Sequence, residues 1–367
     1  MVKLGNIIKA VAKKMNINFY LPLCLAKSEQ IPLDAAKVAF AKDELNRYSK
    51  DANTSCIADN KIDTQVDLQI IIPAYNVEKY ICECIDSIVL PPKGISYIIT
   101  VINDGSTDRT GELLKTYNNI SNVEIITQRN KGFSGARNAG LATIKGRYIA
   151  FVDSDDWIDW AVLEKMVKNA DKNDSDMVEA DFFITDESGK LKSKVKSNPA
   201  HPTGFLWGKI FKGKKWSNFA LPEGYWYEDT IMEQILLEDM KNKSSLSEVV
   251  YYYRQNSKGI TATSRNRKKS VDSLWILLAL HKDREKLRMP TSQKYYEFVL
   301  RHSYLTYSRT KYQEEEVRRK ILLILSDFIN NEFKDYHCEN KKMRILEEII
   351  RSADYGKWKA FCEWVSV

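Results

Sequence analysis

The chain has 367 residues, and at roughly 150 residues per domain this length predicts two or three compact units. Apolar residues make up 44% and charged residues 29%, which is typical of a globular protein and excludes a wholly disordered chain. The net charge of +7 is too small to indicate a nucleic-acid partner. No apolar run approaches the ~18–20 residues of a membrane-spanning helix.

Residues 1–66 are expected to form a helical extension followed by a linker. A first helix is indicated by apolar residues at helical spacing, and residues 34–48 read as a second helix. Residues 49–66 are polar, as in a linker. The basic first helix fits either the membrane surface or packing against protein, and the sequence leaves both open. The apolar residues of the first helix are Leu4, Ile7, Ile8, Val11 and Met15.

The six cysteines show no metal-ligand spacing, which indicates reduced thiols in the cytoplasm. The apolar patch at residues 17–26 imitates a secretion signal, but Asn18 and Pro22 interrupt it, so no signal peptide is expected. A peripheral position at the inner face of the cell membrane and a homo-oligomer are both compatible with these features.

Residues 67–264 are expected to form one domain. Its residues 67–185 alternate between short apolar runs and helical patterns, whereas residues 190–264 are aromatic, lysine-rich and irregular. This alternation indicates parallel βαβ units with both sheet faces covered, and therefore an α/β fold with a mostly parallel sheet. Residues 265–367 return to helical periodicity and are expected to form a C-terminal helical region. The expected strands are residues 68–72, 98–102, 123–126 and 148–152, and the expected helices are residues 77–89, 107–117 and 135–144.

Polar and glycine residues follow each expected strand, at residues 73–76, 103–108, 128–140 and 153–156. The carboxyl ends of parallel strands meet at one edge of a sheet, where α/β proteins bind their ligands. Asp104, on a tight turn there, can accept the imide N–H of a pyrimidine base. The alternative is a helix cap, for which Thr107 and Asp108 are better placed. The glycines and Arg137 within residues 132–140 suit a phosphate.

Asp153, Asp155 and Asp156 put three carboxylates within four residues. Such groups repel one another, and a divalent cation explains their clustering at a strand end, because Mg²⁺ and Mn²⁺ prefer oxygen ligands. The alternative is a solvated acidic loop that caps a helix beginning near Asp159.

These four segments together resemble family 2 glycosyltransferases of the GT-A fold, a Rossmann-like nucleotide-binding domain, and most of all the bacterial members that build capsules, O-antigens and other surface glycans. Three later segments, residues 207–211, 223–230 and 251–261, resemble the family's acceptor-side segment, its Glu-Asp motif and its closing strand with a basic loop. Gly208 stands where many relatives carry Asn, and the Gln-x-x-Arg-Trp motif of processive synthases is missing from the sequence.

The resemblance implies a role for particular residues. Asp229 would be the catalytic base with Glu228 beside it, although acidic residues at this point also suit an exposed helix start. Asp155 and Asp153 would bind the divalent metal, Mn²⁺ or Mg²⁺. The implied acceptor or diphosphate side is weaker and comprises Trp207, Lys209 and Arg254. The implied nucleotide-sugar ligands are Pro73, Ala74, Tyr75, Asn76, Asp104, Gly105, Arg137, Asp153 and Ser154.

The function implied by the resemblance is inverting, metal-dependent transfer of a sugar from a nucleotide-sugar, expected to be a UDP-sugar. The acceptor would be a hydroxyl of a saccharide or of a lipid-linked glycan in surface polysaccharide synthesis. Two alternatives stay open. A sugar-nucleotidyltransferase also uses a sheet, a nucleotide and carboxylate-bound metal, and a glycan-assembly scaffold would keep the fold without catalysis.

Overall fold

The computed structural model describes residues 23, 25–89, 94–257, 259 and 266–364. The expected helix over Leu4 to Met15, with its membrane contact, and most of the loop at residues 258–263 lie outside these residues. The chain divides into two compact units. One contains the described residues up to 51 together with 266–277 and 289–364, and the other contains those of 52–259 together with 278–288.

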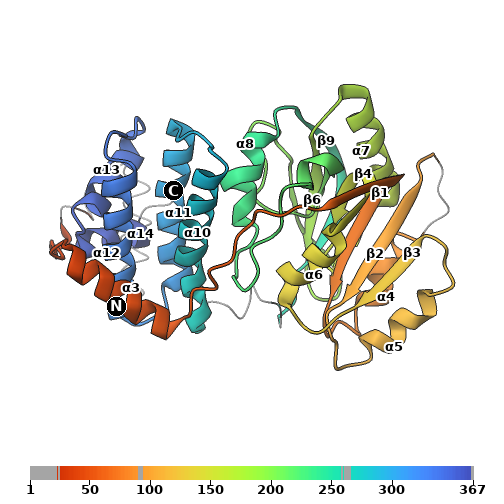
Figure 1. Cartoon of the computed structure of the whole chain (residues 1–367), viewed down its shortest axis with the longest axis horizontal. Helices are drawn as coiled ribbons and strands as arrows, with labels where there is room; N and C mark the ends of the chain where they lie inside the picture. The colour runs from red at the N-terminus through yellow and green to blue at the C-terminus, as the bar shows by residue number, and fades with distance from the viewer. Residues whose placement is uncertain (1–22, 24, 90–93, 258, 260–265, 365–367) are drawn as a thin grey trace. The chain divides into compact units, whose positions relative to one another are not determined.

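In the second unit, nine described strands form one sheet in the order β3-β2-β1-β4-β8-β6-β9-β5, with β7 paired to β6 (Figure 1). The neighbours β3, β2, β1 and β4 are parallel, and β8 is antiparallel to both β4 and β6. The fold is therefore α/β with a mostly parallel core, as predicted. The strands are β1 Lys61–Ala74, β2 Tyr97–Asn103, β3 Val123–Thr127, β4 Thr143–Phe151, β5 Trp157–Ile158, β6 Met177–Thr185, β7 Leu191–Val195, β8 Lys209–Lys212 and β9 Lys243–Arg254.

Helices cover both faces of this sheet because β1 is apolar on both sides. Leu68, Ile70 and Ile72 point into a core shared with α4 (Ile81–Asp86), α5 (Thr110–Leu114) and α7 (Trp160–Asn173). Ile71 points to the opposite face, where α6 (Gly132–Leu141) packs so closely that a Cβ on Gly140 would lie 2.6 Å from the Ile71 side chain. The short α8 (Leu237–Asp239) follows a π-helical turn, Met232–Leu236.

Several boundaries differ from the sequence prediction: α4 and α5 are shorter than the helices predicted at residues 77–89 and 107–117, and β4 begins before the strand predicted at residues 148–152. Two further differences follow from strand pairing. β1 begins at Lys61, inside the segment predicted as linker, because Lys61 and Ile62 continue the ladder by pairing with Thr143 and Ile144 of β4. The same pairing ends the helix predicted at residues 135–144 early: α6 stops at Leu141, and Thr143 already belongs to β4. Pairing across the sheet outweighs polar composition at the start of β1 and helical spacing at the end of α6.

The first unit is helical. Its helix α3 (Ala35–Tyr48) is capped by Asp34, whose side chain accepts a hydrogen bond from Lys37 N, and its position agrees with the predicted second helix. The other helices are α11 (Gln293–Thr310), α12 (Glu315–Glu332), α13 (Lys341–Arg351) and α14 (Tyr355–Trp364). The helix α10 (Asp272–Lys286) contributes residues to both units.

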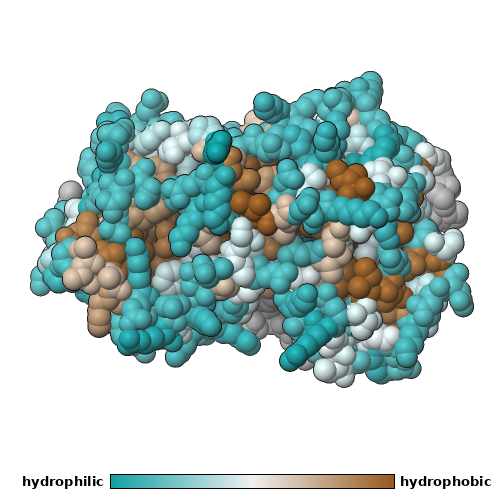
Figure 2. Space-filling model, in the orientation of Figure 1, coloured by the Kyte–Doolittle hydropathy of each residue, from teal (hydrophilic) through white to brown (hydrophobic). Residues whose placement is uncertain are grey.

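No helix among the described residues is long and apolar enough to cross a membrane. The outer surface visible in Figure 2 is mostly hydrophilic, with hydrophobic residues in scattered areas.

Candidate active site

Backbone hydrogen bonds join the loops at the carboxyl ends of four neighbouring strands. Asp104 N donates to Ala74 O at 2.9 Å, which joins the ends of β1 and β2. Gln128 N donates to Asn103 O at 3.0 Å, and Val152 N donates to Ile71 O at 3.1 Å. The polar segments that follow β1, β2, β3 and β4 therefore lie along one edge of the sheet, where the sequence predicted a ligand site.

Asp104 is buried and held in one orientation. Its Oδ1 accepts hydrogen bonds from Gln128 Nε2 at 2.8 Å and Lys131 N at 2.9 Å. The next residue, Gly105, has φ +72°, and a Cβ there would lie 3.0 Å from Asn130 N, so only glycine fits this turn. Asp108 lies just before the start of α5, and its Oδ1 accepts a hydrogen bond from Thr110 N at 2.9 Å, whereas the N-cap position itself is Arg109. Asp104 is thus not used as a helix cap.

In the loop after β1, Asn76 holds the loop in place, whereas Tyr75 is exposed. Asn76 adopts φ +53°, and its side-chain oxygen accepts from Thr107 N at 2.8 Å, which ties this loop to the one after β2. Tyr75 is 47% exposed and presents its ring to solvent. Pro73 and Ala74 are the last two residues of β1.

Arg137 connects the two acidic motifs. Its Nη2 lies 2.5 Å from Asp153 Oδ1, and its Nη1 lies 2.6 Å from Glu228 Oε1. The guanidinium is almost fully buried, and the two carboxylates outweigh the cost of burial and raise its pKa further above the ordinary value. Arg137 is therefore a permanent positive charge between the Asp153–Asp156 segment and the Glu228–Asp229 segment.

Glu228 keeps an elevated pKa in spite of this partner. Burial raises the pKa of Glu228 to about 7, the charge of neighbouring Asp229 raises it too, and Arg137 opposes both. Asp229 O accepts a hydrogen bond from Met232 N at 2.9 Å, so the acidic pair does stand where a helix begins. The burial of Glu228 argues against the exposed helix start considered from sequence.

The three aspartates after β4 differ in environment. Asp153 and Asp155 are partly exposed, whereas Asp156 is buried and accepts a hydrogen bond from Arg254 N at 2.7 Å. Burial and the charge of Asp153 raise the pKa of Asp155. Burial raises the pKa of Asp156 strongly. Asp156 thus has a structural role, whereas Asp153 and Asp155 each keep part of their surface accessible.

Asp153 and Asp155 fit a divalent cation. Arg137 occupies one oxygen of Asp153, and Asn256 Nδ2 lies 3.2 Å from Oδ2 of Asp155. Each carboxylate has a second oxygen, and burial together with the charge of Asp153 raises the pKa of Asp155, an effect that a bound cation would oppose. Oxygen donors of this kind suit Mg²⁺ and Mn²⁺.

The residues expected on the acceptor or diphosphate side are all buried. Trp207 stacks on Tyr251 with ring centroids 4.6 Å apart. The Lys209 ammonium is fully enclosed and donates to Glu179 at 2.9 Å, Thr203 Oγ at 2.6 Å and Phe205 O at 2.8 Å. These three acceptors match its three protons. Arg254 is 4% exposed.

Sequence reasoning missed the partners that hold these groups. Gln128 fixes Asp104, Asn256 contacts Asp155, and Glu179 neutralises Lys209. Gln128 directly follows β3 and was identifiable as a strand-end residue. Glu179 and Asn256 carried no signal, because each meets its partner only through pairing of strands distant in sequence.

Comparisons with known proteins show similarity to glycosyltransferases. A sequence model described as glycosyl transferase family 2 matches residues 69–223. The uncharacterized glycosyltransferase EpsJ of Bacillus subtilis is 30% identical over 219 residues, 53% of this chain and 62% of EpsJ. Glycosyltransferase GlyA of Streptococcus pneumoniae is 31% identical over 212 residues, 51% of this chain and 30% of GlyA. The chain thus spans less than two thirds of the length of these relatives.

Among solved structures, S. aureus TarS residues 1–349 in complex with UDP-GlcNAc superimposes with a TM-score of 0.61 at 22% identity. The match covers 81% of this chain and 90% of that structure. At this level of identity the match shows a shared fold.

Proposed function

We propose, because residues 69–223 match the sequence model of glycosyl transferase family 2, that this chain transfers a sugar from a nucleotide-sugar, expected to be a UDP-sugar, to an acceptor hydroxyl. The observation that carries the proposal is the Arg137 bridge, which brings Asp153 of the expected metal and donor site to Glu228 of the expected catalytic site. A donor site beside a base is the minimum that a single displacement needs.

On the donor side, Asp104 is assigned to the nucleotide base. Its carboxylate is already oriented by Gln128 and Lys131, so accepting the imide N–H of uracil requires no rearrangement. Pro73, Ala74, Gly105 and the exposed ring of Tyr75 would complete the base and ribose site. Ser154 would lie beside them on the β4 loop, while Asn76 would support the site by tying two loops together.

Asp155 and Asp153 would hold Mn²⁺ or Mg²⁺. Such an ion, when bound, supplies a Lewis acid that stabilises negative charge on the departing nucleoside diphosphate. The ion pair with Arg137 fixes the orientation of the Asp153 carboxylate. The ion is also expected to lower the electrostatic cost of burying Asp155, whose pKa is raised in its absence.

Asp229 is assigned as the base that removes the proton from the acceptor hydroxyl, and the reaction would invert the anomeric carbon in one displacement. Glu228, protonated more readily than an ordinary glutamate, would keep a second negative charge from accumulating beside Asp229. Trp207 and Lys209, being enclosed, are assigned to support of this region rather than direct contact with the acceptor.

The physiological acceptor is proposed to be a saccharide or lipid-linked glycan of the cell surface. B. subtilis GgaB, named for minor teichoic acid biosynthesis, is 30% identical over 213 residues, which supports this class of acceptor. The five cysteines among the described residues are all free thiols, in keeping with a cytoplasmic reaction at the inner membrane face.

The proposal is tested with a panel of nucleotide-sugars, each incubated with Mn²⁺, with Mg²⁺ and with EDTA. Slow release of the nucleoside diphosphate, together with protection against heat, is expected for one donor and only with metal. Nucleoside triphosphates with sugar phosphates form the second arm: turnover there would instead identify a nucleotidyltransferase. If neither arm shows binding or turnover, a non-catalytic glycan-assembly scaffold would be favoured.

A further inference from the structure

We propose that Arg254 is a positioning residue that fixes the Asp153–Asp156 loop for metal binding and does not itself contact the diphosphate. The inference rests on the proposed function. Arg254 is the last residue of β9. It carries a basic charge at the end of a strand beside the expected donor site, which would suit a phosphate ligand, but its contacts within the protein indicate another role.

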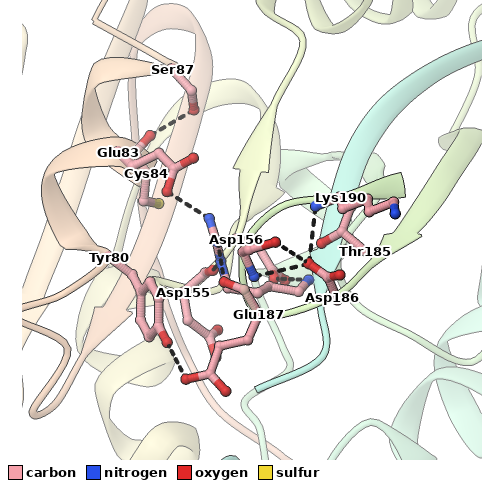
Figure 3. A network of polar contacts seen from close by, with 12 residues as sticks. Tyr80, Glu83, Cys84, Ser87, Asp155, Asp156, Thr185, Asp186, Glu187 and Lys190 are labelled. Carbon is pink, nitrogen blue, oxygen red and sulfur yellow. Dashed lines mark hydrogen bonds and ion pairs between the residues drawn. The ribbon is translucent and has the colours of Figure 1, made fainter. Parts of the chain in front are cut away.

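Each nitrogen of the Arg254 guanidinium donates to a different segment of the chain. Its Nε lies 2.8 Å from Asp155 O, and its Nη1 lies 2.9 Å from Glu187 O in the turn between β6 and β7. Its Nη2 lies 2.6 Å from Glu83 Oε2 on α4. The Arg254 side chain therefore joins the Asp153–Asp156 loop, the turn between β6 and β7, and helix α4. Figure 3 shows residues of these three segments.

The guanidinium is also held between aromatic groups. Its central carbon lies 4.6 Å from the centroid of the Trp157 ring and 4.9 Å from that of Tyr80. Tyr80 Oη in turn donates to Glu187 Oε1 at 3.0 Å, a contact visible in Figure 3. These contacts leave 4% of Arg254 exposed, and its planar face is used for stacking.

Residues at and just after the end of β9 contact the Asp153–Asp156 loop at several points. Arg254 N donates to Asp156 Oδ1 at 2.7 Å, while the Arg254 side chain holds the carbonyl of Asp155. Asn256, two residues further, approaches the Asp155 carboxylate itself. The loop is thus held at the Asp155 carbonyl, the Asp155 carboxylate and the Asp156 side chain. These contacts restrict its movement, so the Asp155 carboxylate is preorganised for a ligand.

A positioning residue and a diphosphate ligand predict different consequences of the same substitution. Arg254→Lys keeps the positive charge, but a compact ammonium lacks the planar guanidinium whose three nitrogens reach three separate segments, and it cannot stack on an aromatic ring as a plane. If Arg254 positions the loop, metal binding suffers and metal-free nucleotide binding does not. If Arg254 contacts the diphosphate, UDP binding weakens even without metal.

The experiment measures free Mn²⁺ by electron paramagnetic resonance at saturating UDP, and UDP binding by calorimetry in EDTA. For Arg254→Lys we expect the Mn²⁺ dissociation constant to rise about 10- to 100-fold and the UDP dissociation constant in EDTA to stay within about 2-fold of the wild type. Equal loss of UDP binding in EDTA, or unchanged Mn²⁺ binding, would overturn the inference.

Arg147→Lys is the matched control. Arg147 also makes two ion pairs, with Asp67 and Asp171, and lies over the Tyr148 ring, but it stands in the middle of β4. Neither constant should change in this variant. A wild-type protein that binds no Mn²⁺ with UDP would contradict the proposed function rather than the role of Arg254.

Glu83→Gln covers the case in which Arg254→Lys does not fold. Glu83 is 53% exposed on its side chain, so the fold should tolerate the change. Loss of one charged anchor is expected to weaken Mn²⁺ binding about 3-fold, again without an effect in EDTA. No effect of this variant, with Arg254→Lys unfolded, would reject the proposal.

Discussion

Arg137 Nη1 lies 2.6 Å from Glu228 Oε1, across 91 positions of sequence. The other terminal nitrogen of the same guanidinium meets Asp153, so one buried cation is shared by two acidic motifs. Removing either acid would leave the cation undercompensated in a low-dielectric environment, which is costly. Glu228 and Asp153 are therefore coupled through Arg137, and substitution of either one is expected to affect the other.

The pH dependence of stability tests the environment of Glu228. Its pKa in the folded protein is about 7, above the ordinary value of 4.5, so between these values the folded state binds more protons than the unfolded state. The wild-type free energy of unfolding should accordingly fall as the pH rises through this window. In Glu228→Gln that loss should vanish, which reduces the slope by on the order of 1 kcal/mol per pH unit.

Urea unfolding at several pH values measures both slopes. Glu112→Gln, which changes an exposed glutamate of α5, is the control and should keep the wild-type slope. Parallel curves for wild type and Glu228→Gln would show that burial does not raise the Glu228 pKa.

Asp229→Asn separates binding from catalysis. The amide cannot accept the acceptor proton, so transfer should fall about 100- to 10,000-fold, while UDP binding in Mn²⁺ stays unchanged. Calorimetry and a product assay give the two numbers. The control is Asp239→Asn in α8, an acid exposed enough to expect no effect on either. Full turnover by Asp229→Asn would disprove the base assignment.

Lys209→Met tests the buried ion pair. The substitution leaves Glu179 buried without its cation, which should cost about 3–5 kcal/mol of unfolding free energy. Lys212→Met, on the same strand, removes a pair in which Asp174 is 86% exposed, and should cost less than about 1 kcal/mol. Chemical denaturation measures the unfolding free energy of both variants. Equal losses of unfolding free energy would contradict the importance assigned to burial of the Lys209–Glu179 pair.

Asp104→Asn tests the assignment of the base. The new amide would present a donor to the imide N–H of uracil, so UDP affinity should fall about 10-fold or more. CDP affinity should fall less or rise, because cytosine presents an acceptor at that position. Asp108→Asn, in the same loop but hydrogen-bonded to Thr110 N, should not alter the UDP to CDP ratio. If the ratio of UDP to CDP affinity were unchanged in Asp104→Asn, Asp104 would not be the residue that binds the nucleotide base.

The sequence was sufficient for the fold class and the order of the motifs, because strand apolarity and strand-end polarity are local signals. Asp153 and Asp155, which follow the end of β4, are examples. The boundaries of β1 and α6 were not predictable, because they depend on pairing between Lys61 and Thr143. Propensity carries no information on such a register.

The surroundings of the basic side chains were the least predictable part of the site. Lys209 and Arg254 stand in motifs that suggest contact with a ligand, yet both are enclosed by residues distant in sequence, Glu179 for one and Glu83 for the other. A charge in a motif indicates that a partner exists. Only the tertiary structure identifies whether that partner is a ligand or the protein itself.

The most direct test of the account is a UDP titration of wild type and Asp155→Asn, each in Mn²⁺ and in EDTA. The account predicts that wild type binds UDP more tightly in Mn²⁺ than in EDTA, and that Asp155→Asn binds with the same weak affinity in both. If Asp155→Asn retained the full gain from Mn²⁺, the carboxylates after β4 would not be the metal site, and the proposed mechanism would be wrong.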